Sequence, residues 1–257
     1  MARLRAVSHE DRLTLVEHLD ELRTRIVVCL AVFGVALALC FWQNHLLLEV
    51  ASNPLPSGHR KLLTFGVTEP FMTTMTISIY GALALSMPIL IYQLYAFVLP
   101  AFKPTERRLA LPILLLAPFL FAAGVAFAYF IVMPAAVKFL LGFNSGQFNI
   151  QVRARDYYSF FGTTMLAGGI VFQLPLGILA VTRLGIVSVA QLRANRRYAY
   201  LAISIIAAAL PGVDPISMLL EMVPLLVLYE LSILLARAFG RPGVAAGGLV
   251  KPSTQER

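Results

Sequence analysis

The chain has 257 residues, of which 59% are hydrophobic and only 13% are charged, and its formal net charge is +8. Soluble domains are typically about 45–50% apolar and about 25% charged, so this composition excludes an ordinary soluble domain and indicates a membrane protein. The positive charge does not indicate nucleic-acid binding, because Lys and Arg collect in the cytoplasmic loops of membrane proteins.

The first feature along the chain is an amphipathic segment. Leu15, Leu19, Leu22 and Ile26 recur on one helical face, and charged residues occupy most of the other positions. The pattern predicts an amphipathic helix at the cytoplasmic membrane interface. This helix would belong to a cytoplasmic N-terminal segment, residues 1–25, and lead into the first membrane span.

Long apolar runs follow this segment. A helix needs about 17–25 apolar residues to cross the hydrocarbon. Runs without Asp, Glu, Lys or Arg cover residues 26–48 and lie between residues 69 and 103, 108 and 138, and 156 and 183. A final apolar stretch, 198–236, is interrupted at 211–215 by two prolines and a glycine, which end a helix. We therefore predict an all-α membrane protein with six transmembrane helices in residues 26–236, with short fifth and sixth helices of about 14 and 20 residues.

The distribution of basic residues predicts the topology. If the N-terminus is inside, 16 of the 21 Lys and Arg residues fall in cytoplasmic segments and five fall in outer loops. The positive-inside rule then predicts that both termini are cytoplasmic. The two larger outer loops would cover residues 49–69 and 134–156. The C-terminal segment, 237–257, is rich in Gly, Pro and polar residues and is expected to be a disordered cytoplasmic tail.

Several short motifs resemble those of the TatC family, the core subunit of the twin-arginine protein translocase. Residues 17–25 (EHLDELRTR) resemble its HLxELRxR opening, and residues 88–108 resemble its PxxxYQxWAFxxPxLxxxERR motif. Shorter matches occur in the family's order: xPL at 53–55, EPF at 69–71, FAYF at 127–130, FQLP at 172–175 and YE at 229–230. The resemblance extends over residues 15–237 and assigns Pro54 a structural role in the first outer loop.

The resemblance implies a receptor and assembly platform that binds signal peptides with two consecutive arginines on folded precursor proteins. It assigns signal-peptide binding to Glu21, Arg23, Phe97 and Glu106. A carboxylate accepts two parallel hydrogen bonds from a guanidinium, and lysine cannot reproduce that fork. Without the resemblance, the two acids could have no role in binding. Glu21 would then pair with Arg25 one turn later and stabilise the helix, and Glu106 would be an exposed loop acid.

The resemblance also implies partners and a location. We expect single-span TatA- and TatB-type subunits, self-association, export driven by the proton-motive force, and a bacterial inner or plasma membrane (or an archaeal or organellar equivalent). No cofactor, metal or nucleic acid is expected, and the sequence lacks the G-x-x-x-x-G-K-[ST] loop that binds nucleotide phosphates.

Four polar residues fall within or beside the predicted spans, where such groups are costly and usually have a partner or a role. Gln173 stands where many TatC relatives carry Glu; because an amide cannot titrate, a helix–helix hydrogen bond and a functional role are both open.

Glu221 and Glu230 should lie on opposite helix faces. We expect Glu221 to supply a polar contact to a partner subunit, and Glu230, at a family position, to lie about 10 Å from Arg237. Asp214 is expected either to cap the start of the last helix or to have a functional role in the protein.

A small-solute secondary transporter is the main alternative. It would need charged pairs deep in several helices and an internal repeat, and the sequence has neither. An intramembrane enzyme is disfavoured, because the four histidines lack metal-binding spacing and no nucleophile motif is present. We therefore predict a protein that is not an enzyme.

Overall fold

The computed structural model describes residues 15–98, 107–183, 185–210 and 215–239. The first three residues of the predicted disordered tail, 237–239, are the helical end of α10. The rest of that tail and the two acids Glu106 and Asp214 lie outside these ranges. Within them the chain is helical, with one isolated β-bridge, and five segments are long and apolar enough to cross a membrane. The helices are α1 (Leu15–Trp42), α2 (Asn44–Ser52), η1 (Ser57–His59), α3 (Glu69–Val98), α4 (Arg107–Phe127), η3 (Ala128–Val132), α5 (Met133–Gly142), α6 (Ala154–Val171), α7 (Leu174–Arg183), α8 (Val189–Ala194), α9 (Arg196–Ala209) and α10 (Pro215–Phe239).

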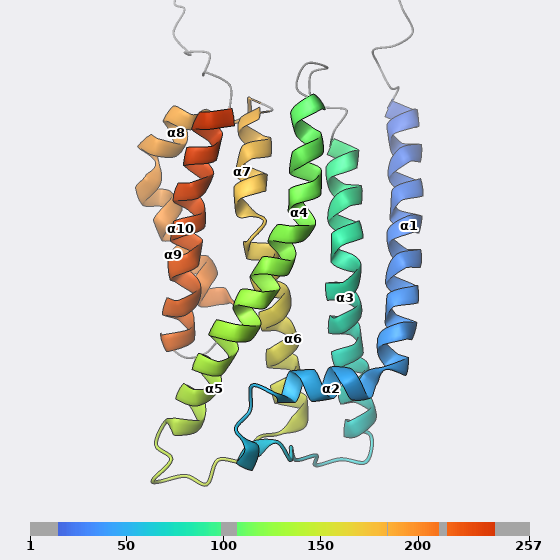
Figure 1. Ribbon diagram of the computed structural model, residues 1–257, viewed down its shortest axis with the longest axis vertical. Helices are drawn as coiled ribbons and strands as arrows, with labels where there is room; N and C mark the ends of the chain where they lie inside the picture. Colours follow the sequence, from blue (N-terminus) through green and yellow to red (C-terminus); the bar gives the residue numbers. More distant parts are fainter. Residues whose placement is uncertain (1–14, 99–106, 184, 211–214, 240–257) are drawn as a thin grey trace, which may run out of the picture.

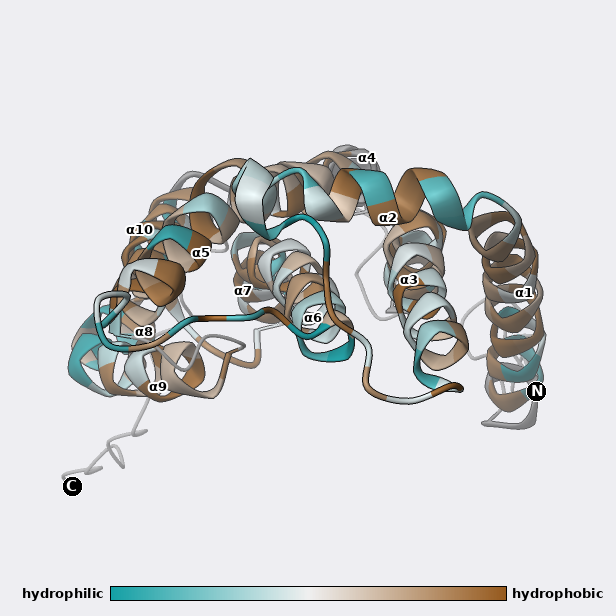
Figure 2. Cartoon of the chain, turned by 90° about the horizontal axis from the view of Figure 1, so that it is seen from below, coloured by the Kyte–Doolittle hydropathy of each residue, from teal (hydrophilic) through white to brown (hydrophobic). Residues whose placement is uncertain are grey.

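The long helices run side by side along one axis, as Figure 1 shows. We call the end where α1 begins and α10 ends the upper end, and the end crossed by α2 the lower end. Figure 2 shows α1 at one edge of the bundle and α9 with α10 at the other. α1 packs chiefly on α3, α3 on α6, and α7 on α10, so segments far apart in sequence form the bundle.

The first helix differs from the prediction at both ends. α1 is continuous from Leu15 to Trp42, so the predicted interfacial helix is not a separate element but the first turns of the span. The only glycine in α1 is Gly34 and it has no proline, so nothing in its sequence interrupts the helix. The span then ends at Trp42 rather than at residue 48, because the backbone turns at Gln43 and continues as α2 across the lower end.

Prolines account for two interruptions that the sequence analysis did not place. Before Pro134, which has no N–H to donate, the helix widens into the π-turn η3, and Met133 N–H bonds the carbonyl of Ala128 five residues back. The fourth apolar segment breaks at residues 172–173, before Pro175, and divides into α6 and α7. The chain stays helical through η3, whereas the break at 172–173 separates two helices.

The α4–α6 crossing depends on glycine. A Cβ built on Gly124 would lie 2.4 Å from the carbonyl oxygen of Gly168, so the two backbones are in direct contact. A Cβ on Gly169 would similarly lie 2.3 Å from the ring of Phe121. Small residues that allow such close approach are typical of helix packing in membranes, where hydrophobic association gives little driving force.

The last two helices agree with the prediction only in part. α9 has 14 residues, as expected, and reaches only about 21 Å. α10 has 25 residues and is not short, because Pro224 is accommodated inside it without ending it. The prediction of a short sixth helix was therefore wrong.

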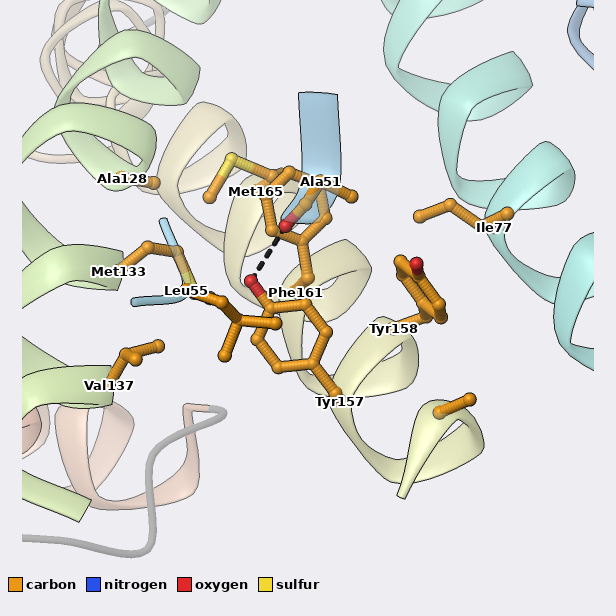
Figure 3. Packing of buried hydrophobic residues seen from close by; sticks show 11 residues of the cluster. Ala51, Leu55, Ile77, Ala128, Met133, Val137, Tyr157, Tyr158, Phe161 and Met165 are labelled. Atoms are coloured by element: carbon orange, nitrogen blue, oxygen red, sulfur yellow. Dashed lines mark hydrogen bonds between the residues drawn. The ribbon is translucent and has the colours of Figure 1, made fainter. Parts of the chain in front are cut away.

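The lower end has a buried core between α2, α3, α5 and α6. The aromatic residues Tyr157, Tyr158 and Phe161 of α6 pack there against Ala51 and Leu55, as Figure 3 shows. Tyr157 donates a hydrogen bond of 2.6 Å to the carbonyl of Ala51. These contacts fix α2 across the ends of the long helices.

Candidate functional site

A cluster of polar side chains joins α1 to α3 at the upper end. The Arg25 guanidinium donates from Nε and Nη2 to Oε1 of Glu21, at 3.0 and 2.5 Å, and from Nη1 to Oε1 of Gln93, at 2.7 Å. The pair is partly buried, since 23% of the Arg25 side chain and 27% of the Glu21 side chain are exposed. The pairing of Glu21 with Arg25 that the residues alone allowed is present, and Arg25 also donates a hydrogen bond to a second helix, α3.

The same contact brings Glu21 to the level of Phe97. α1 and α3 run in opposite directions (Figure 1). The residue one turn before Arg25 therefore lies level with the residue one turn after Gln93. These two positions are Glu21 and Phe97. Arg23 is exposed and, two positions from Glu21, points to another side of α1. Two of the four residues assigned to signal-peptide binding therefore lie at the same level of neighbouring helices, and Glu106 lies outside the described residues.

Gln173 lies at the break between α6 and α7. Its Nε2 donates a hydrogen bond of 3.1 Å to the carbonyl of Ala117 on α4. The helix–helix hydrogen bond considered from the sequence is therefore present. It connects the break to the neighbouring helix, close to the glycine crossing of α4 and α6.

Glu221 points into the bundle. Its side chain is 8% exposed and lines a cavity of about 20 Å³ with Thr164, Gly168 and Phe172 of the fourth apolar segment. A cavity of that volume holds about one water molecule. A buried carboxyl here offers little surface to a partner helix, so the expected contact with a partner has no direct support from this geometry.

Glu230 lies on the opposite face of α10, as the nine-residue spacing predicted. Its carboxylate accepts hydrogen bonds from Arg196 at 2.6 Å and from the hydroxyl of Tyr200 at 2.5 Å, both on α9. Its ion-pair partner is thus Arg196 rather than Arg237, the nearest arginine on its own helix. This cluster holds the short helix α9 against α10.

Comparison with known families identifies the chain. The model of the family described as "Sec-independent protein translocase protein (TatC)" matches residues 17–224, which is most of the chain. The chain belongs to the TatC family. It is 37% identical to the TatC protein of Carboxydothermus hydrogenoformans, over 89% of this chain and 95% of that protein. It is 33% identical to TatC of Escherichia coli strain K12, over 91% of this chain and 92% of that protein.

A solved structure agrees in fold. The crystal structure of the twin-arginine translocase receptor TatC matches with a TM-score of 0.76 at 32% identity, covering 88% of this chain and 100% of that one. This TatC chain is therefore a multi-pass membrane protein and a subunit of the twin-arginine, Sec-independent protein translocase. By family it is a non-catalytic transport component.

An ion pair at the lower end of this TatC chain joins two residues for which the sequence predicted no pairing. Arg153 donates from Nε and Nη2 to the two carboxylate oxygens of Glu69, at 2.8 and 3.3 Å, and Glu69 also accepts from the N–H of Phe65. Glu69 raises the pKa of the Arg153 guanidinium through the hydrogen bond. Leu63 forms the isolated bridge with Arg153, so this bridge joins the loop between η1 and α3 to the start of α6. Pro54, at the start of that loop, follows the last turn of α2.

Two apolar grooves lie along the membrane-spanning part of this TatC chain. One, of about 580 Å³, extends between α3 and α4 from Pro88 to Val50 on α2. The other, of about 530 Å³, lies between η3 and α10 and is lined only by apolar residues and Pro224. Grooves of this kind accept an apolar side chain, lipid chain or helix rather than a charged group.

Proposed function

We propose that this chain is the receptor and assembly-platform subunit of its translocase. It binds the consecutive arginines of signal peptides on folded precursors at the cytoplasmic face. It recruits single-span TatA- and TatB-type subunits for export driven by the proton-motive force. The protein spans a bacterial-type inner or plasma membrane with six helices, α9 being the short fifth, and both termini are cytoplasmic.

The bond from Arg25 to Gln93, which puts Glu21 level with Phe97 on the neighbouring helix, is the observation that carries this proposal. A carboxylate at the membrane surface accepts the two parallel donors of a guanidinium, and an aromatic face nearby attracts the same cation. The resemblance assigns a second carboxylate, Glu106, to the same function, and Glu106 precedes α4 in the chain. Two carboxylates together with an aromatic residue would suit a ligand with two adjacent arginines.

The charge distribution supports the orientation. If the upper end is cytoplasmic, 16 of the 21 Lys and Arg residues of the sequence fall in cytoplasmic segments, as the positive-inside rule requires. Residues 1–25 and 237–257 are then cytoplasmic segments flanking the membrane domain, 26–236. A solved relative carries the description "Twin Arginine Translocase Receptor", which is consistent with a receptor role here.

The groove between η3 and α10 supports partner recruitment. It is apolar, lies at membrane depth and is about 530 Å³, so the side chains of a single membrane-spanning helix can enter it. The short helix α9 beside α10 leaves a thinner hydrophobic layer, which a partner helix would cover. Glu230, Arg196 and Tyr200 hold α9 in that position.

The receptor function is tested by binding. Purified protein is titrated with a precursor that carries Arg-Arg or, as the comparison, Lys-Lys. We expect a clear preference for Arg-Arg, and binding by Glu106→Ala that is about tenfold or more weaker at an unchanged protein level. Glu49→Ala, an exposed acid on α2 at the lower end, is the matched control and should bind normally. Equal binding of the two precursors by the unaltered protein would contradict receptor function; normal binding by Glu106→Ala would contradict only the site.

A further inference from the structure

A guanidinium already occupies the candidate site. Arg25 places the Nε–Nη2 edge of its guanidinium on Glu21 and directs Nη1 to Gln93 on the neighbouring helix. One planar cation therefore spans a carboxylate on α1 and an amide oxygen on α3. This is the arrangement that an incoming arginine side chain would need.

The geometry points to Gln93 as a further guanidinium-binding residue of this site, with Arg25 as the internal occupant that the signal-peptide arginine displaces. The inference rests on the proposed function and adds two residues to it. Gln93 contributes the second acceptor, and Arg25 keeps the pocket formed by Glu21 and Gln93 filled when no precursor is bound.

The exchange of Arg25 for a cargo arginine would keep Glu21 paired with a guanidinium both before and after the precursor binds. Glu21 and Arg25 are each about three-quarters buried, so a bare carboxylate at this position would be costly. Replacing Arg25 by a cargo arginine keeps the charge and the number of hydrogen bonds constant. A lysine ammonium carries its three N–H donors on one atom and cannot present two edges of a plane to the two acceptors, so it replaces the occupant poorly.

The two residues have opposite predicted effects on binding. Removing the occupant lowers the cost of entry for any ligand, so Arg25→Gln should tighten binding of Arg-Arg and Lys-Lys signal peptides by the same factor, about two- to fivefold. Removing the second acceptor affects only a ligand that can reach it. Gln93→Leu should weaken binding of the Arg-Arg peptide about two- to tenfold and leave the Lys-Lys peptide within about twofold, so the ratio of the two affinities falls.

Charge-matched variants separate this exchange from simple electrostatics. Arg25→Lys keeps the positive charge but loses the fork, so it should still tighten binding, by about twofold. Gln93→Glu keeps an acceptor oxygen and should retain the preference for Arg-Arg. These conservative variants also keep the test valid if Arg25→Gln or Gln93→Leu fails to fold.

The experiment is a titration of the purified full chain, in detergent, with fluorescent synthetic signal peptides carrying Arg-Arg or Lys-Lys. Weaker Arg-Arg binding by Arg25→Gln and Arg25→Lys would overturn the role of Arg25 as an occupant and make it a residue that positions Glu21. An unchanged affinity ratio in Gln93→Leu would overturn the role of Gln93. Both outcomes differ from failure of the receptor function, in which the unaltered protein itself shows no preference for Arg-Arg.

Discussion

The two ends of this molecule are built differently. At the lower end, α2 closes the bundle over a buried aromatic core, and the Glu69–Arg153 pair joins the start of α3 to the start of α6 across 84 positions of sequence. At the upper end, α1 is held to α3 by a guanidinium that is itself partly exposed. The comparison indicates a fixed scaffold below and exchangeable contacts above, which is where a receptor for changing cargo would bind.

The packing that supports the scaffold should be the least tolerant of change. Gly124→Ala adds a Cβ 2.4 Å from the carbonyl oxygen of Gly168, so the α4 and α6 backbones must separate. We expect a loss of about 3 kcal/mol of stability, measured as a lower thermal midpoint of the purified protein and a lower yield of monodisperse material. Gly34→Ala in α1 is the matched control, because a Cβ there meets nothing within 4 Å. An equally stable Gly124→Ala protein would mean that the α4–α6 crossing is not the packing constraint.

The hydrogen bond that holds α2 should have a smaller effect. Tyr157→Phe removes the donor to the Ala51 carbonyl and leaves a buried oxygen without that bond. The expected cost is about 1–2 kcal/mol, again measured as a lower thermal midpoint. Tyr92→Phe is the control, since the Tyr92 side chain is 48% exposed on α3. If the two variants melt alike, the lower end is not held by this bond.

The sequence predicted the features that depend on local pattern. Apolar runs located the membrane-spanning segments, and the two prolines and the glycine within 211–215 predicted the separation of a 14-residue helix from the last one. The spacing of Glu221 and Glu230 put them on opposite faces because helical geometry is regular. The family motifs named Glu21 and Phe97, and the bond from Arg25 to Gln93 puts these two residues at the same level of neighbouring helices.

The features that the sequence did not predict depend on long-range contacts. The pairing of Glu69 with Arg153 and the bond from Arg25 to Gln93 join residues 84 and 68 positions apart, and no local pattern encodes them. Pro134 and Pro224 illustrate the same difficulty. One is preceded by a π-turn and the other lies inside a continuous helix, because neighbouring helices decide how the missing backbone donor is accommodated.

The smallest change in stability is expected at the upper end, together with a large change in binding. Glu21→Ala breaks a partly exposed ion pair. The decrease in the thermal midpoint should therefore correspond to a loss of no more than about 1 kcal/mol in the free energy of unfolding. Arg25 retains its acceptor on Gln93, which keeps α1 and α3 together. Binding of an Arg-Arg signal peptide should nevertheless fall about tenfold or more, because the carboxylate that accepts the guanidinium is gone. A protein that lost stability and binding in proportion would show that Glu21 is part of the scaffold, and the two ends would then not differ in kind.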